Sequence, residues 1–476
     1  MKKSTLLILV LICTQTFSQI TFQKYYDPGD SRGYGIQQTP EGGYISVISL
    51  ECSPSVLMRL DSIGNFVWGK EFDPEYGFHD VLRTSDGGYL VTGDMCLTQP
   101  FVIKTDSLGD TLWCRKFDPV WWTSGKAIEV NGGYVLFSGN KIYKIDLSGN
   151  LAWYKSYSCI LHDINLTPDS GFILSGRDNY DLVIIRTDSL GDSLWTKKFS
   201  NGQYFSASVI AGNNNSFIIG GTIGGVPFLI RTDSSGDTIW TKQYSGNTSS
   251  GRISLLTNSN EDIIMFEGDW PYKLYVLKTD GFGNPIWAKE MGNDGVEFGN
   301  AQITTDHGFI LTCAWYTGGA NDAAIIKLDS LGNGSCKDTV WYPTVSNMTV
   351  NVSNPGLIVT SIPINEFYMQ PNIVNSVNAL VVCSQVNVDD RLQTLINPLS
   401  VFLEEDKIVI QFNSSKKVTA NLRLIDITGK IMIQKDFNLK QGFNSTQFLA
   451  GELSSGIYFL NMYAESKAFN TKFIVK

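Results

Sequence analysis

Two histidine–aspartate pairs are the residues of this sequence whose types and spacing best suit chemistry. His79-Asp80 and His162-Asp163 occupy the same position in a repeated unit, just before the strand expected to lie innermost. An imidazole beside a carboxylate can hold a metal ion or orient a ligand. Only two of seven repeats carry the pair, and His307 lies in a different turn. The pattern therefore favours hydrogen-bonded structural histidines over a metal site, and no cofactor is expected.

Aromatic residues gather in the segments that join the expected strands. Such segments are ordinarily polar, and flat rings beside charged groups suit sugar binding, because a ring face covers C–H groups while charged groups take hydroxyls. The expected ligand-contact residues are Trp121, Trp122, Trp270, Tyr272, Trp315, Tyr316, Arg177 and Asp178. Burial against a neighbouring repeat is the alternative role for each ring.

Cys336 and Cys383 bracket a segment rich in Ser, Thr, Asn and Val. A disulfide between them would fasten this segment to the preceding repeat, and two unrelated thiols are the equal alternative.

A hairpin that recurs seven times must position all these residues. Each copy has an aspartate, a glycine three residues later, Asn or Asp next, and in six copies a tryptophan seven residues after the aspartate. The aspartates are Asp61, Asp106, Asp146, Asp188, Asp233, Asp280 and Asp329. Glycine supplies the positive φ that a short hairpin needs, and the aspartate can accept the turn amides.

A second hairpin precedes each copy, as in "DVLRTSDGGYLVTGD" from Asp80, so each unit holds four short strands. Four strands in about 45 residues is the size of a β-propeller blade, and seven copies predict seven blades. The seventh copy lacks a blade-ending strand, whereas Phe22, Lys24 and Tyr26 fill that strand's tryptophan, basic and aromatic slots. We therefore expect the N-terminal strand to close the ring.

Composition limits the partners. The formal net charge is −9 and no Lys/Arg-rich run occurs, which argues against nucleic acid or an anionic membrane surface. Lys2 and Lys3 precede an apolar run that ends at Ile12, as in a signal peptide cut near Gln19. No transmembrane segment is expected, because no segment reaches roughly 18 apolar residues.

Two family resemblances extend this interpretation. The Asp–Gly–Trp hairpin resembles the tryptophan-docking repeat of quinoprotein-like propellers, although no adjacent cysteine pair or acidic calcium constellation accompanies it. "LRLIDITGKIMIQKDF" (422–437), "LSSGIYFL" (453–460) and the terminal "KFIVK" strongly resemble the C-terminal sorting domain of the type IX secretion system. That resemblance implies a small β-sandwich, recognition by the type IX machinery, and a secreted or outer-membrane surface location.

The expected class is all-β, a seven-bladed propeller followed by a small C-terminal β-sandwich. The expected organisation is a signal peptide (1–19), the propeller (20–336), a linker or small β extension (337–390) and the sorting domain (391–476). One expected function is a binding module for a glycan, peptide or protein. The alternative is an extracellular polysaccharide hydrolase or lyase. Two acids converging at the funnel would favour the enzyme, and an aromatic platform without them would favour binding.

Overall fold

The protein consists of two compact units, one spanning residues 20–384 and the other containing residues 385–476. The computed structural model describes residues 19–26, 31–49, 54–72, 76–95, 99–117, 125–200, 202–245, 251–268, 273–292, 296–316, 321–334, 338–355, 366–368, 373–374, 379–383, 396–404, 407–414, 417–426, 431–449, 456–464 and 467–475. Apart from the short 3-10 turn η1 (Asn213–Asn215), every regular element in these ranges is a β-strand. The expected signal peptide lies, except for Gln19, outside the described residues.

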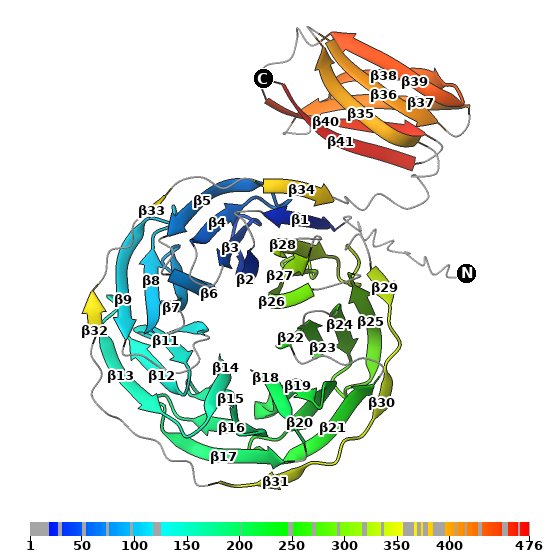
Figure 1. Cartoon of the computed structure of the whole chain (residues 1–476). Coiled ribbons are helices and arrows are strands. Elements are labelled where there is room, and N and C mark those ends of the chain that lie inside the picture. The colour runs from blue at the N-terminus through cyan, green and yellow to red at the C-terminus, as the bar shows by residue number, and fades with distance from the viewer. Residues whose placement is uncertain are drawn as a thin grey trace, which may run out of the picture. The chain divides into compact units, whose positions relative to one another are not determined.

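Seven antiparallel sheets, the blades, stand around a central channel (Figure 1). Blade 1 contains β2 (Arg32–Gln38), β3 (Tyr44–Ser49), β4 (Ser55–Leu60) and β5 (Phe66–Phe72). Blade 2 contains β6 (Tyr76–Arg83), β7 (Tyr89–Met95), β8 (Gln99–Thr105) and β9 (Thr111–Phe117). Blade 3 contains β10 (Ala127–Val130), β11 (Gly133–Ser138), β12 (Lys141–Ile145) and β13 (Leu151–Ser156). Blade 4 contains β14 (Ile160–Leu166), β15 (Phe172–Asp178), β16 (Asp181–Thr187) and β17 (Ser193–Ser200).

The remaining three blades follow the same order from the channel outward. Blade 5 contains β18 (Tyr204–Ala211), β19 (Phe217–Ile223), β20 (Val226–Thr232) and β21 (Thr238–Ser245). Blade 6 contains β22 (Arg252–Thr257), β23 (Ile263–Gly268), β24 (Leu274–Thr279) and β25 (Pro285–Met291). Blade 7 contains β26 (Val296–Ile303), β27 (Phe309–Tyr316), β28 (Asn321–Leu328) and the N-terminal β1 (Phe22–Tyr26).

The N-terminal strand β1 completes blade 7. It pairs antiparallel with β28, from Phe22 opposite Lys327 to Tyr26 opposite Ala323. Phe22 and Tyr26 are 1% and 0% exposed. This is the strand position expected from the residue slots, and it removes the unpaired edge that blade 7 would otherwise present.

The repeated tryptophan joins each blade to the next. A Cβ added to Gly109, at φ +80°, would lie 2.7 Å from the Trp68 ring of the preceding blade. Phe22 takes the tryptophan's place against Gly64, at 2.6 Å. The same contact recurs at Gly149, Gly191, Gly236, Gly283 and Gly332. The glycine is therefore required twice, for its positive φ and for the approach of the ring.

The other repeated slots also serve the ring. In blade 2, Asp106 Oδ1 accepts the amides of Leu108 and Asp110, each at 2.9 Å. The Lys70 Nζ of blade 1 donates to Asp110 Oδ1 at 2.8 Å. Turn geometry and contact with the neighbouring blade thus account for the repeated residues. A functional site is therefore sought among the residues that differ from blade to blade.

A segment between residues 338 and 383, which we call the belt, adds short strands to the outer edges of six blades. It pairs β29 (Asp338–Val340) with β25, β30 (Thr344–Ser346) with β21, β31 (Asn351–Ser353) with β17, β32 (Glu366–Tyr368) with β9, β33 (Ile373–Val374) with β5, and β34 (Ala379–Cys383) with β1. The belt therefore passes blades 6, 5, 4, 2, 1 and 7, opposite to the order in which the chain builds them (Figure 1).

Side chains of the belt join the core. Trp341 is 9% exposed and lies edge-on to Tyr275, with the ring centroids 5.5 Å apart. Its amide donates to the Ala288 carbonyl at 3.0 Å. The segment expected to be a linker or a small β extension is thus spread around the ring, with one short strand on each of six blades.

The C-terminal unit contains two antiparallel sheets. One consists of β35 (Ile396–Glu404), β36 (Lys407–Ser414) and β39 (Gly442–Leu449). The other consists of β38 (Ile431–Leu439), β37 (Val418–Asp426), β40 (Gly456–Ala464) and β41 (Lys467–Val475). Ile410, Leu422 and Leu424 are buried.

Candidate functional site

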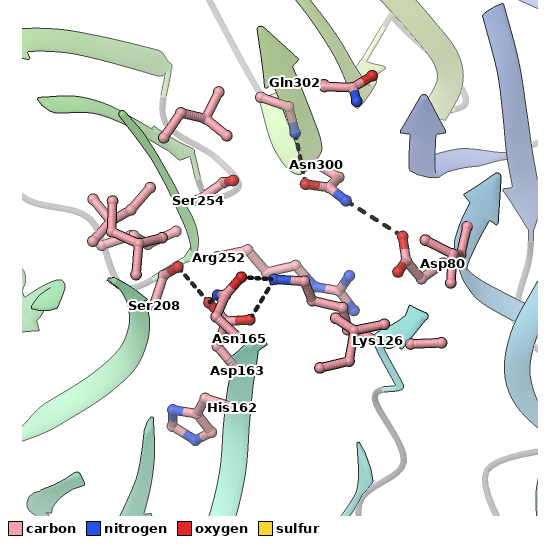
Figure 2. A pocket seen from close by; sticks show the side chains of 18 of the residues that line it. Asp80, Lys126, His162, Asp163, Asn165, Ser208, Arg252, Ser254, Asn300 and Gln302 are labelled. Carbon is pink, nitrogen blue, oxygen red and sulfur yellow. Dashed lines mark hydrogen bonds and ion pairs between the residues drawn. The ribbon is translucent and has the colours of Figure 1, made fainter. Parts of the chain in front are cut away.

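The innermost strands of the blades line a cavity of about 600 Å³ at the centre of the ring. Each blade contributes one residue at an equivalent position, and we call these residues the polar ring. They are Gly35, Asp80, Lys126, Asp163, Ser208, Ser254 and Asn300. Figure 2 shows the six side chains of this set around the cavity.

Irregular strand pairing brings two consecutive side chains to the cavity in some blades. The register of β6 against β7 shifts between Phe78 and Asp80, and that of β14 against β15 shifts between Leu161 and Asp163. As a result His79 lines the cavity together with Asp80, and His162 together with Asp163. Regular strand alternation would send one of each pair to the opposite face, whereas a bulge re-aims it.

Asp163 is fully engaged by its neighbours. Its Oδ1 accepts from Lys126 Nζ and from the Ile164 amide, at 2.9 and 2.8 Å. Its Oδ2 accepts from Ser208 Oγ and the Val209 amide, at 2.6 and 3.2 Å. Because Ser208 and Val209 belong to blade 5, this carboxylate fastens blade 4 to blade 5.

Asp80 occupies the corresponding position in blade 2, but its carboxylate has fewer hydrogen-bond donors around it than that of Asp163. It accepts the amides of Val81 and Ala127, and Asn300 Nδ2 lies 3.4 Å from its Oδ1. Burial raises the pKa of Asp80 to about 7, although Lys126 and these hydrogen bonds oppose the rise. Near neutral pH the carboxyl is therefore divided between its protonated and ionised forms.

Arg252 extends into the cavity from the start of β22 (Figure 2). Its guanidinium carbon lies 4.8 Å from the centroid of the Tyr34 ring, within the range of a cation–π contact. Within the described ranges no carboxylate or other hydrogen-bond acceptor is paired with this guanidinium. The polar ring therefore contains one cation, Lys126, that is paired with a carboxylate. A second cation, Arg252, lies beside the ring, and its contact is the face of Tyr34.

The two histidines have different surroundings. His79 Nε2 is hydrogen bonded to Asp94 Oδ2. Burial, aided by Arg177, lowers the pKa of His162 to about 4 against the attraction of Asp163, so that His162 is neutral at pH 7. Within the described residues no three His, Cys, Asp or Glu side chains form a possible metal site.

The aromatic residues expected to contact a ligand are placed only in part. Trp121, Trp122, Trp270 and Tyr272 lie outside the described residues. Trp315 is 7% exposed in β27, with its ring 6.1 Å from that of Tyr25, and Tyr316 ends the same strand. Arg177 and Asp178 end β15 in another blade, where Asp178 Oδ2 accepts from Lys198 Nζ at 2.9 Å. Trp315 thus comes from a different blade than Arg177 and Asp178, and none of these three lines the cavity.

The proposed disulfide partners are also placed only in part. Cys336 lies outside the described residues, and Cys383 ends β34. Sequence reasoning had named the two His-Asp positions but missed Lys126, Ser208, Ser254, Asn300 and Arg252. For Lys126, Ser208, Ser254 and Asn300 the available signal was their place before the turn between the first two strands of each blade, since no single residue type marks that place, and Arg252 lies two residues before Ser254.

Comparison with known proteins identifies the C-terminal unit. Residues 404–476 match the family model of the secretion system C-terminal sorting domain. No curated protein sequence matches the chain. Among solved structures, the chain is similar to virginiamycin B lyase from Staphylococcus aureus, with 14% identity over 65% of this chain and 99% of that one, at a TM-score of 0.47. It is also similar to YCF48 from Cyanidioschyzon merolae, with 11% identity over 64% and 98%, at 0.45.

The family match bears on location. A type IX sorting domain is read by the secretion machinery that exports its cargo, and no helix in the described part of the chain has the length and apolarity of a membrane span. The chain is therefore a seven-bladed β-propeller followed by a type IX C-terminal sorting domain, and it is secreted or displayed on the cell surface.

Proposed function

We propose that the protein is an extracellular binding module that holds a small polar ligand in its central channel. The observation that supports this proposal is the polar ring. The cavity of about 600 Å³ falls within the range of about 300–1,000 Å³ typical of small-molecule sites. The polar ring presents hydroxyl, amide and charged side chains from six blades, which is the kind of fixed polar surface that selects a ligand.

Binding accounts for the charged groups better than catalysis does. Asp163 accepts five hydrogen bonds and joins blades 4 and 5, so its contacts account for it as a structural group. A glycoside hydrolase needs two carboxyl groups with separate roles on either side of the scissile bond. Asp80, whose pKa is about 7, has the protonation behaviour of a general acid, and no second carboxyl group with a raised pKa lines the cavity among the described residues.

The enzyme therefore remains a second candidate, and it depends on Asp80. Under this alternative the secreted protein would release reducing ends from an extracellular polysaccharide, and Asp80→Asn would abolish the release. Asparagine retains an oxygen that can accept the Val81 and Ala127 amides, so the ring should survive this change. Cleavage that is lost in Asp80→Asn would replace the binding proposal.

The loop residues extend the proposal to larger ligands. Trp121, Trp122, Trp270 and Tyr272 are still proposed as contacts for a glycan longer than the channel. Trp315, Tyr316, Arg177 and Asp178 complete that proposed set.

A blocked channel tests the binding proposal. The secreted protein would be screened on a glycan array and with small polar molecules by thermal shift. Ser254→Trp places an indole at the polar ring, whereas Ser235→Trp places one in an exposed turn where other blades carry Leu190 or Phe282. We expect Ser254→Trp alone to lose the ligand while both variants keep the melting behaviour of a folded propeller. Equal binding by the two variants would move the site away from the channel.

A further inference from the structure

We propose that the channel ligand carries a carboxylate, and that Arg252 binds this group. The inference rests on the proposed function, because it names the chemical class of the ligand that the channel holds. It is drawn from the charge balance of the cavity and from the position of the Arg252 guanidinium against Tyr34.

The charge balance leaves one cation uncompensated. Lys126 is paired with Asp163 at 2.9 Å, so these two charges offset one another. Asp80 is ionised only in part near neutral pH, because burial stabilises its protonated form. Arg252 is then the group in the cavity that lacks an anion among the described residues. In a chain whose formal net charge is −9, carboxylates are plentiful, yet none that the structure describes is placed against this guanidinium.

An uncompensated cation in a partly enclosed cavity is costly, because it loses hydration without gaining an ion pair. A bound anion would supply the missing ion pair. The excess positive charge therefore selects an anionic ligand over a neutral one of the same size.

The Tyr34 contact prepares Arg252 for a carboxylate. Tyr34 is 8% exposed, so its ring forms a fixed part of the wall. The cation–π contact holds the guanidinium carbon 4.8 Å from the centroid of this ring, and the planar guanidinium carries five N–H donors, more than the ring face can take. Two parallel N–H groups match the two oxygens of a carboxylate, and such bidentate pairs are stronger than neutral hydrogen bonds.

Neighbouring groups suit the hydroxyls of the same ligand. Ser254 lies two residues after Arg252 on β22, so both residues occupy the same face of the strand. Asn300 and Gln302, on the innermost strand β26 of the next blade, also line the cavity. A carboxylate with several hydroxyls, such as a uronate or another sugar acid, would satisfy both sets of groups.

Calorimetric titration of the full secreted protein tests this assignment. The probes are glucuronate, galacturonate and gluconate, with glucose and galactose as the neutral counterparts. Arg252→Gln removes the guanidinium. Arg83→Gln, at the exposed end of another innermost strand, removes the same charge elsewhere and controls for net charge. We expect at least one acid to bind, its neutral counterpart to bind at least tenfold more weakly, and Arg252→Gln to reduce the affinity for the acid at least tenfold.

Three outcomes overturn the inference. One is that no acid binds, another is equal binding of the acid and its neutral counterpart, and the third is equal affinity in Arg252→Gln and Arg83→Gln. A neutral sugar that binds as tightly as its acid and is excluded by Ser254→Trp would refute the carboxylate while leaving the channel as the site. A ligand that binds equally well to Ser254→Trp and Ser235→Trp would refute the channel itself. Arg252→Lys checks the geometry, since a lysine keeps the charge without the planar fork and should restore only part of the affinity.

Discussion

The docking of each tryptophan on the next blade's glycine predicts a specific difference between two glycine-to-alanine substitutions in blade 2. Gly109 and Gly87 have φ values of +80° and +86°, so alanine at either costs about 1–2 kcal/mol for the left-handed backbone. A Cβ on Gly87 meets nothing within 4 Å, whereas one on Gly109 lies 2.7 Å from the Trp68 ring. Overpacking of this kind adds about 1–3 kcal/mol. Gly109→Ala should therefore destabilise the propeller by about 2–5 kcal/mol in total.

Urea unfolding of the secreted protein, followed by circular dichroism, measures both losses. The clash should also disappear when the ring is removed, so that in a Trp68→Ala background Gly109→Ala costs no more than Gly87→Ala does. Equal losses for the two single substitutions in the otherwise unaltered protein would refute the argument that the tryptophan requires the glycine. So would a Gly109→Ala loss that persists at full size without Trp68.

Three further outcomes follow from the ring, the sorting domain and the buried histidine. Phe22→Ala should lower the free energy of unfolding in urea by about 3–5 kcal/mol, because Phe22 is 1% exposed in the closing strand. Phe282 is 73% exposed, so Phe282→Ala should change it little. Similar losses for the two would contradict closure by β1. Deleting residues 404–476 should leave the propeller inside the cell envelope, and cell fractionation that finds it outside would contradict the export role of that domain. The pKa of His162 falls from 6.5 to about 4 on folding, so between these pH values the unfolded chain binds more protons than the folded one. The free energy of unfolding should therefore fall as the pH drops through this interval, and His162→Gln should flatten that fall. An unchanged slope would refute the lowered pKa of His162.

The repeat made the fold predictable from sequence, because every repeated residue has a local or next-blade partner. Glycine and aspartate fix each turn, the tryptophan fixes the neighbour, and Phe22 with Tyr26 identified the closing strand in the absence of a full repeat. The belt was not predictable in the same way. Its strands are two to five residues long, which is too short for a period-two pattern, and their partners lie roughly 50 to 360 residues earlier in the chain.

The candidate site was predictable only in its location. The His-Asp pairs marked the innermost strands, but it is the aspartates that form the hydrogen bonds to neighbouring blades. Lys126, Ser254 and Arg252 share no residue type, so no motif could group them. Lys126 and Ser254 share a position before the first turn of their blades, and Arg252 lies two residues before Ser254, but that these positions face one cavity is seen only when the strands are paired.

The belt has a consequence for damage to the ring. The polypeptide travels around the propeller once to build the blades and again, in the reverse direction, to pair with their outer edges. A protease cut between blades 4 and 5 would leave two fragments, yet β31, β32, β33 and β34 of the later fragment would still be hydrogen bonded to blades of the earlier one and to β1. The nicked protein should therefore migrate as one species on a native gel and as two on a denaturing gel. For a protein released outside the cell, where nothing rebuilds a broken chain, this arrangement allows the ring to outlast a cut in its backbone.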